Sequence, residues 1–178
     1  FDVTDKIGFA YGVRYSDFRN YGPRTVNVYA EGETRSTSSI INTVEYSDEE
    51  IINYQGWEPR ASMSYQFDPT ASVKLGYNIN YQYIHLISNT AAISPVDIWK
   101  LSDTFIEPQI VTQYSLGLFK NFKNNRFETS VEGFYKEFEN TLDYKDGADL
   151  FLNPALETEL ISGLGRSYGL EFYMSKTF

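Results

Sequence analysis

Hydrophobic and polar side chains alternate along this chain with a period of two residues. The stretch SVKLGYNINYQYIHL, from Ser72 to Leu86, shows the alternation most clearly. Even positions up to Gln82 are small or polar, and odd positions from Val73 to Tyr83 are apolar or aromatic. Successive side chains of a β-strand point to opposite faces of a sheet, so this pattern predicts a strand with one polar and one apolar face.

The same pattern recurs in five further segments, with charged residues kept to the polar face. The apolar face carries Phe9, Tyr11, Val13 and Tyr15; Ala61, Met63, Tyr65 and Phe67; Tyr114, Leu116 and Leu118; Phe127, Thr129, Val131 and Tyr135; and Tyr168, Leu170, Phe172 and Met174. The polar face carries Arg14, Lys74, Asn78, Asn80, Glu128, Glu132 and Glu171. Segments that share one binary pattern predict an all-β protein with antiparallel strands.

The links between these strands are of two kinds. Two are short polar turns, at Asp68-Pro69-Thr70 and Lys123-Asn124-Asn125. The others are far longer than hairpin loops: roughly 40 residues between Asp17 and Glu58, and about 25 each for His85 to Ile110 and Glu139 to Gly165. Short turns therefore lie at one end of the predicted sheet and long loops at the other.

A transmembrane β-barrel explains this asymmetry better than a soluble β-sandwich. A barrel turns its apolar face to lipid and its polar face to the lumen, with short periplasmic turns and long extracellular loops. The segments also reach the ~9–11 residues of a tilted membrane strand, and their aromatic residues recur near strand ends. We expect an antiparallel transmembrane β-barrel segment of about six to eight strands, with Ile79 facing lipid, Asn80 facing the lumen, and links 20–57, 89–109 and 141–162 outside the cell.

Composition agrees with this interpretation and excludes several others. The chain has 178 residues, of which 17% are aromatic, and strands favour such residues. No run of about 18 apolar residues predicts a transmembrane helix. Because the chain starts at Phe1 without a charged and apolar leader, we expect a mature product or an excised segment of one domain.

Charge and cysteine content remove further classes of function. The chain has no cysteine, which excludes disulfides and thiolate chemistry. Its net charge is −9, with no cluster of Lys and Arg, so nucleic acid is not an expected partner.

The only histidine is the main candidate for catalysis. His85 follows Tyr81 and Tyr83 in the apolar register, so we expect an interfacial residue facing lipid. Ser88 and Asp97 are near it only in sequence, and a histidine without an assigned nucleophile and orienting group does not make a triad. We predict that the protein is not an enzyme.

Acidic and aromatic residues in the long links are the remaining candidates. Asp143, Asp146 and Asp149 in DYKDGAD miss the Asp-x-Asp-x-Asp-Gly spacing of a calcium loop and its closing Glu, so solvated charge is the better interpretation, as it is for Asp48-Glu49-Glu50. A loosely bound divalent cation stays an alternative. Trp57 and Trp99 either stack on a sugar or siderophore or pack a loop against the barrel rim.

Charges on the polar face are expected to form ion pairs across the lumen side or to contact a plug; they are Arg14, Lys74, Glu128, Glu132 and Glu171. We assign no catalytic, cofactor-binding or metal-binding residue, expect no cofactor, and leave the ligand-binding residues unknown.

Several motifs resemble the barrel of a TonB-dependent outer-membrane receptor, in the branch with a carboxypeptidase-regulatory-like N-terminal domain. They are Tyr83-Ile84-His85-Leu86-Ile87-Ser88-Asn89, Pro95-Val96-Asp97-Ile98-Trp99, Ile106-Glu107-Pro108-Gln109, Gln113-Tyr114-Ser115-Leu116-Gly117, Asn121-Phe122, Tyr144-Lys145-Asp146-Gly147-Ala148, Leu152-Asn153-Pro154, and Gly163 with Tyr168-Gly169-Leu170-Glu171. The resemblance covers essentially the whole chain as an interior slice of a larger barrel; the plug and the TonB box of the family are absent from it.

The resemblance implies an outer-membrane transporter that imports a nutrient such as a siderophore, cofactor or glycan. It implies as partners the lipid bilayer, the remainder of the barrel and its plug, the TonB complex through that plug, and a surface lipoprotein. A complete small eight-stranded barrel with a structural or adhesive role is the alternative; residues 25–32 and 36–46 would then form an extra hairpin. If the chain is part of a larger barrel, segments 8–15 and 168–174 are not hydrogen-bonded to each other.

Overall fold

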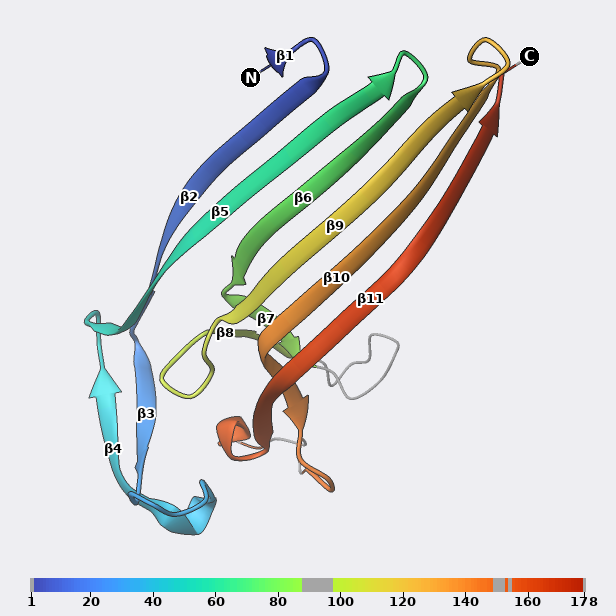
Figure 1. Ribbon diagram of the computed structural model, residues 1–178. Helices are drawn as coiled ribbons and strands as arrows, with labels where there is room; N and C mark the ends of the chain where they lie inside the picture. The colour runs from blue at the N-terminus through green and yellow to red at the C-terminus, as the bar shows by residue number, and fades with distance from the viewer. Residues whose placement is uncertain (1, 88–97, 149–152, 154, 178) are drawn as a thin grey trace.

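The largest unit of the fold is a seven-stranded antiparallel sheet, which we call the wall (Figure 1). The computed structural model describes residues 2–87, 98–148, 153 and 155–177. The strand order of the wall is β1-β2-β5-β6-β9-β10-β11. These strands are β1 (Asp2–Thr4), β2 (Ile7–Tyr21), β5 (Glu50–Asp68), β6 (Ala71–Gln82), β9 (Gln109–Phe122), β10 (Phe127–Tyr144) and β11 (Leu160–Lys176).

Smaller elements gather at the end of the wall that is opposite β1 and the last residues of β11 (Figure 1). They are the hairpin of β3 (Arg24–Tyr29) and β4 (Ile40–Tyr46), the hairpin of β7 (Ile84–Ile87) and β8 (Ile98–Leu101), and the 3-10 helices η1 (Thr37–Ser39) and η2 (Leu156–Thr158). Together with residues 102–108 we call them the cap. Within the described residues, no helix is long and apolar enough to cross a membrane.

The six long strands of the wall coincide with the six alternating segments of the sequence, which confirms the all-β prediction. Four of them run further into the cap than the alternation indicates: β2 continues to Tyr21, β5 begins at Glu50, β10 continues to Tyr144 and β11 begins at Leu160. These extensions carry polar residues on both faces, so the binary pattern could not mark them as strand.

Both expected hairpin turns form as predicted. Asp68 and Thr70 close the β5–β6 turn, where the Thr70 backbone N–H donates to Asp68 Oδ1 at 2.8 Å. In the β9–β10 turn, Lys123, Asn124 and Asn125 have φ angles of 51°, 55° and 63°. Asn tolerates this left-handed region better than most residues, which fits its place in a tight turn.

The register places large apolar side chains on one face of the wall. Tyr11, Tyr77, Tyr114, Tyr135 and Tyr168 occupy one cross-strand row, which only Ala61 interrupts. The next row toward the turns contains Phe9, Met63, Leu75, Leu116, Gly133 and Leu170. Leu170 and Phe172 are 70% and 76% exposed, whereas large apolar side chains of a water-soluble sheet are normally covered.

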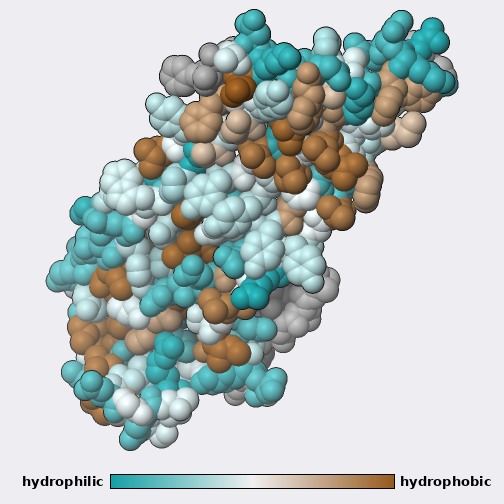
Figure 2. Space-filling view, viewed as in Figure 1, coloured by the Kyte–Doolittle hydropathy of each residue, from teal (hydrophilic) through white to brown (hydrophobic). Residues whose placement is uncertain are grey.

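Charged residues mark the limits of this apolar face. On β11 the outward positions between Arg166 and Lys176 are all apolar or aromatic. Those ten residues span ~33 Å along the strand, or ~25 Å along the normal of a membrane when the strand is tilted by ~40°. This is the height of the apolar band of an outer-membrane barrel. Figure 2 shows hydrophobic side chains gathered across the strands, with hydrophilic ones at the turns.

The wall is an open sheet. β2 pairs with β1 and β5, and β11 pairs with β10 alone among the described strands. Residues 8–15 and 168–174 are therefore not hydrogen-bonded to each other, which confirms that prediction. The extra hairpin that the small-barrel alternative assigned to residues 25–32 and 36–46 does form, but β3 and β4 pair only with each other and add nothing to the wall.

Candidate functional site

The cap is the part of the chain where side chains from several links meet, and it forms the candidate site. Its small core consists of Ile87, Ile106, Leu156 and Leu160, which are buried against one another. Ile87 ends β7, Ile106 lies in the β8–β9 link, Leu156 begins η2 and Leu160 begins β11, so segments from different parts of the chain fold into one packed body.

Two buried residues, Ser102 and Asp103, join the cap to the wall. The Asn20 side chain at the end of β2 donates to the backbone carbonyl oxygen of Ser102 at 2.9 Å. The Tyr54 hydroxyl of β5 donates to the backbone carbonyl oxygen of Asp103 at 2.8 Å. The Ser102 backbone N–H donates to the carbonyl oxygen of Tyr83 at 2.8 Å. Because Ser102 and Asp103 are 0% and 1% exposed, these contacts hold the β8–β9 link firmly on the strand ends.

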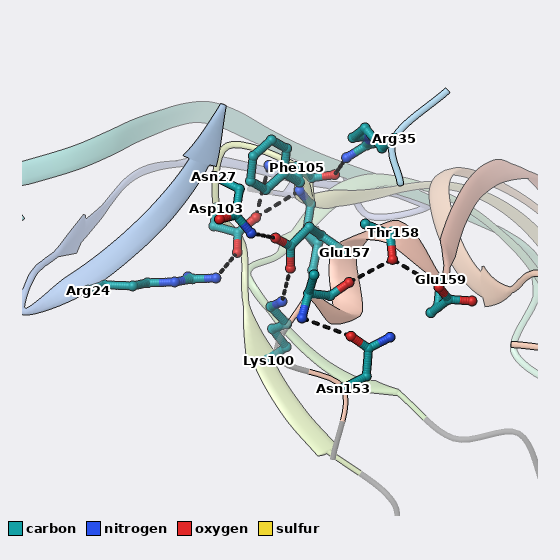
Figure 3. Close-up of polar contacts among 12 residues, drawn as sticks. Arg24, Asn27, Arg35, Lys100, Asp103, Phe105, Asn153, Glu157, Thr158 and Glu159 are labelled. Atoms are coloured by element: carbon teal, nitrogen blue, oxygen red, sulfur yellow. Dashed lines mark hydrogen bonds and ion pairs between the residues drawn. The ribbon is translucent and has the colours of Figure 1, made fainter. Parts of the chain in front are cut away.

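The Asp103 carboxylate binds both its own loop and the β3–β4 hairpin. Its Oδ1 accepts the backbone N–H groups of Phe105 and Ile106 at 2.9 and 3.0 Å. Its Oδ2 accepts Arg24 Nη2 of β3 at 2.7 Å (Figure 3). One carboxylate thus stabilises the turn of its own loop and also binds β3.

Glu157 of η2 is the second buried carboxylate of the cap. Its Oε1 accepts Asn27 Nδ2 and the Tyr29 hydroxyl, both at 3.0 Å, and its Oε2 lies 3.6 Å from Lys100 Nζ (Figure 3). Burial raises the Glu157 pKa, but its hydrogen bonds and Lys100 outweigh this and hold that pKa below its usual value. Burial, with the neighbouring carboxylate, raises the pKa of Tyr29 to about 12. Glu157 is therefore an ionised link between three elements.

His85 is buried in the cap and does not face lipid, so that prediction was wrong. Its Nε2 lies 3.0 Å from the Ser102 hydroxyl, and the residue is 5% exposed. Burial lowers the His85 pKa, partly offset by the charge of Asp103. The alternation of β6 does not continue across Tyr83 into β7, which pairs with β8 instead of the wall. Ser102 is fully buried, so this serine and histidine offer no open catalytic site. Ser88 and Asp97 lie outside the described residues.

Tyr81 and Tyr83 are also not on the lipid side. The Tyr83 hydroxyl lies 2.6 Å from that of Ser16, and its ring stacks on Phe18 at 4.9 Å, both on the polar face of β2. The pairing of β5 with β6 ends at Arg60, next to Pro59, which has no backbone N–H to donate. A Cβ on Gly56 would lie 2.9 Å from the Tyr81 ring, so the glycine leaves room for that ring.

The polar face of the wall holds fewer ion pairs than expected. Arg14 pairs with Glu58, which is fully buried. Lys74 lies over the Phe119 ring at 5.3 Å, and across the described part of the wall no ion pair includes Lys74, Glu128, Glu132 or Glu171. Glu132 and Glu171 are direct cross-strand partners, so two carboxylates stand side by side on this face.

The two tryptophans lie in strands, not in irregular links. Trp57 belongs to β5 and packs against Tyr15 with ring centroids 4.8 Å apart, on the apolar face of the wall. Trp99 belongs to β8 and is 69% exposed. It lies on the same face of its hairpin as Ile84, Leu86 and Leu101, whose side chains are also exposed.

The acidic links form no metal centre in the described chain. Asp143 lies in β10 and Asp146 in the turn after it, whereas Asp149 is outside the described residues. Within the described residues, no group of three acidic or histidine side chains could hold a metal ion. The two carboxylates that bind β3, Asp103 and Glu157, were missed, because nothing in the sequence pairs them with that strand. The only available signal was the Asp-x-Phe-Ile run at Asp103, which suits a side chain that caps its own loop.

An antiparallel sheet with an apolar outward band, a polar opposite face and a cap at one end defines the wall of an outer-membrane β-barrel. A family model described as TonB dependent receptor-like, beta-barrel, matches residues 1–176. The chain therefore belongs to the family of TonB-dependent receptor β-barrels, which are outer-membrane transport receptors and not enzymes. No curated protein and no solved structure matches it.

Proposed function

We propose that this chain forms part of the wall and part of the extracellular cap of an active importer. The nutrient is one that porins admit too slowly, such as a siderophore, a cofactor or a glycan. Energy for import reaches the receptor from TonB through a plug inside the barrel. The more detailed likeness, to receptors with a carboxypeptidase-regulatory-like domain, stays a prediction from the sequence motifs.

The open wall is the observation that carries this proposal. In a bilayer every backbone N–H and C=O must be hydrogen-bonded, so a membrane sheet has to close. β1 with β2 forms one edge of the wall and β11 forms the other, and these edges do not meet. Further strands are therefore needed on both sides, and six long strands supply roughly a quarter of the 22-stranded barrel that the sequence resemblance implies.

The polar face of the wall fits a lumen that is filled by a plug. Glu132 and Glu171 stand together without a described cation, and Arg60 on β5 has no described carboxylate. Opposite charges on a plug would pair with both groups. The exposed apolar side of the β7–β8 hairpin is a surface on which the expected lipoprotein partner could dock.

Closure of the barrel is the test of this function. Residues 1–178 produced alone and refolded in detergent should not give the compact, heat-modifiable band of a closed barrel on an SDS gel. The receptor produced from its whole gene should give that band. Deletion of the gene should abolish uptake of one compound in a panel of iron chelates, corrinoids and glycans, to the same extent as loss of TonB. A compact band from residues 1–178 alone would instead support the small eight-stranded barrel.

The sidedness of the wall gives a second test. An epitope inserted at Glu33, in the β3–β4 hairpin, should be stained on intact cells, because the cap lies outside the cell. An epitope at Asn124, in the β9–β10 turn, should be stained only after the outer membrane is permeabilised. The reverse staining would contradict the proposed orientation.

A further inference from the structure

Like the β7–β8 hairpin, the β3–β4 hairpin is joined to the wall by no strand ladder. It forms a sheet of its own and shares no ladder with the wall or with β7–β8. At its base the chain crosses itself, where the Gly22 backbone N–H donates to the Glu49 carbonyl oxygen at 3.1 Å. A Cβ on Gly22 would lie 2.5 Å from the Ser47 carbonyl oxygen, so only glycine permits this crossing. The hairpin thus leaves the wall through one narrow base.

Beyond this base, most contacts between the hairpin and the rest of the cap are polar. Arg24 binds Asp103, while Asn27 and Tyr29 bind Glu157 (Figure 3). The ring of Phe105 adds an edge contact with Tyr29 at 5.4 Å and a contact with Arg35. Only Val26 is a buried apolar residue of β3 or β4, and none of the core residues of the cap comes from the hairpin.

Both carboxylates keep other partners that do not belong to the hairpin. Asp103 is bound by two backbone N–H groups of its own loop, and Glu157 has Lys100 nearby. Glu157 is also fixed by its neighbours Leu156 of η2 and Leu160 of β11, which are part of the cap core. If the hairpin departed, neither charge would be left buried without a partner. The large penalty that usually follows when a buried ion pair is broken would therefore not arise.

We propose that the β3–β4 hairpin is a hinged flap that Asp103 and Glu157 latch onto the rest of the cap. The hinge is the crossing at Gly22 and residues 47–49. Release breaks the contacts of Arg24, Asn27 and Tyr29 together, because all three are on one short strand. The wall, the β7–β8 hairpin and η2 stay folded when the flap opens. This device goes beyond the proposed transport function and does not depend on which nutrient is carried.

Distance measurement between two spin labels tests the latch. One label is placed at Glu33 on the flap and the other at Ser162 on β11, in the full receptor with any other cysteines replaced; residues 1–178 contain none. The D103N/E157Q variant keeps the shape of both side chains and removes their charges. Because hydrogen bonds to charged groups are the stronger ones, we expect the population with a long label distance to rise about tenfold.

Two further variants keep the result interpretable. E159Q changes a neighbouring carboxylate whose side chain, among the described residues, accepts the Thr158 hydroxyl, and it should leave the distances as in the unmodified receptor. R24Q/Y29F weakens the latch from the flap side and should reproduce the long distance. Unchanged distances in D103N/E157Q would overturn the proposal. Loss of hydrogen-exchange protection in β7–β8 along with the longer distance would also overturn it, because the cap would then be unfolding as a whole.

Discussion

The wall and the cap place the same kinds of side chain in opposite environments. In the wall, large apolar residues such as Leu170 are exposed, and glycine, serine and charged residues line the other face. In the cap, Ile87, Ile106, Leu156 and Leu160 are buried, and the carboxylates Asp103 and Glu157 are buried with them. Lipid covers the apolar face of the wall, whereas the cap must cover its own. The apolar side chains of the wall are therefore stabilised by contact with lipid, whereas those of the cap are stabilised by contact with one another.

Large-to-small substitutions give the greatest contrast between these regions. Ile106→Ala should reduce the stability of the cap by about 2–5 kcal/mol, because it opens a cavity that the surrounding side chains cannot fill. Leu170→Ala should cost only about 1–2 kcal/mol, the transfer of the lost methyl groups, because lipid fills the space. Hydrogen exchange of the cap and urea unfolding from bilayers measure the two effects. Equal costs would mean that the face with Leu170 is packed against protein.

A lysine on each face of β9 tests the orientation of the wall. Leu116→Lys places a charge in the apolar band and should cost about 2–4 kcal/mol in folding from urea into bilayers, whereas Gln113→Lys on the lumen side should cost far less. Ile79, the position that the sequence suggested, shares its row with Thr112, Glu137 and Arg166 and so lies near the edge of the band. A similar cost for both lysines would contradict the assigned faces.

Acid should loosen the cap. The folded-state pKa values of His85 and Glu157 are both lowered, so the unfolded cap binds more protons at low pH and its stability falls as pH falls. Loss begins below the ordinary His pKa of about 6.5 and continues below the ordinary Glu pKa of about 4.3. Hydrogen exchange of β7 and η2 against pH measures this effect.

His85→Gln is the control for that titration. Its amide can still bond to Ser102 but cannot become charged, so the first stage of the loss should disappear and the second should remain. A cap whose exchange is independent of pH between 7 and 4 would show that neither group is held in its described environment.

The smallest expected effect concerns the two carboxylates on the lumen side. Glu132→Gln removes repulsion from Glu171, its partner on the neighbouring strand. We expect it to raise the stability of the receptor by about 0.2–1 kcal/mol. Thermal unfolding of the receptor, followed by loss of heat-modifiable mobility, gives the measurement. A decrease instead would indicate that a basic group inside the lumen already pairs with both carboxylates.

The wall could be predicted from the sequence, and the cap could not, for a physical reason. Contact with lipid on one side and water on the other imposes a period of two on every strand, so segments such as 72–83 show their faces directly. The cap depends on contacts between distant links, such as Arg24 with Asp103 and Asn27 with Glu157. Local patterns carry no information on such contacts, which is why His85 was placed on the wrong side.

The row of tyrosines across the wall has a consequence for depth. A cross-strand row is perpendicular to the strands, so when the strands tilt by ~40° the row also slants, by ~3 Å of depth for each strand spacing of ~4.8 Å. Between Tyr168 and Tyr11 it therefore changes depth by ~15 Å. Tyr168 lies two positions from Arg166, whereas Tyr11 lies six positions from Asp17. The row of tyrosines therefore slants from the headgroup region at Tyr168 into the hydrocarbon at Tyr11. The five phenol rings lie at different depths in the membrane and do not form a belt at one interface.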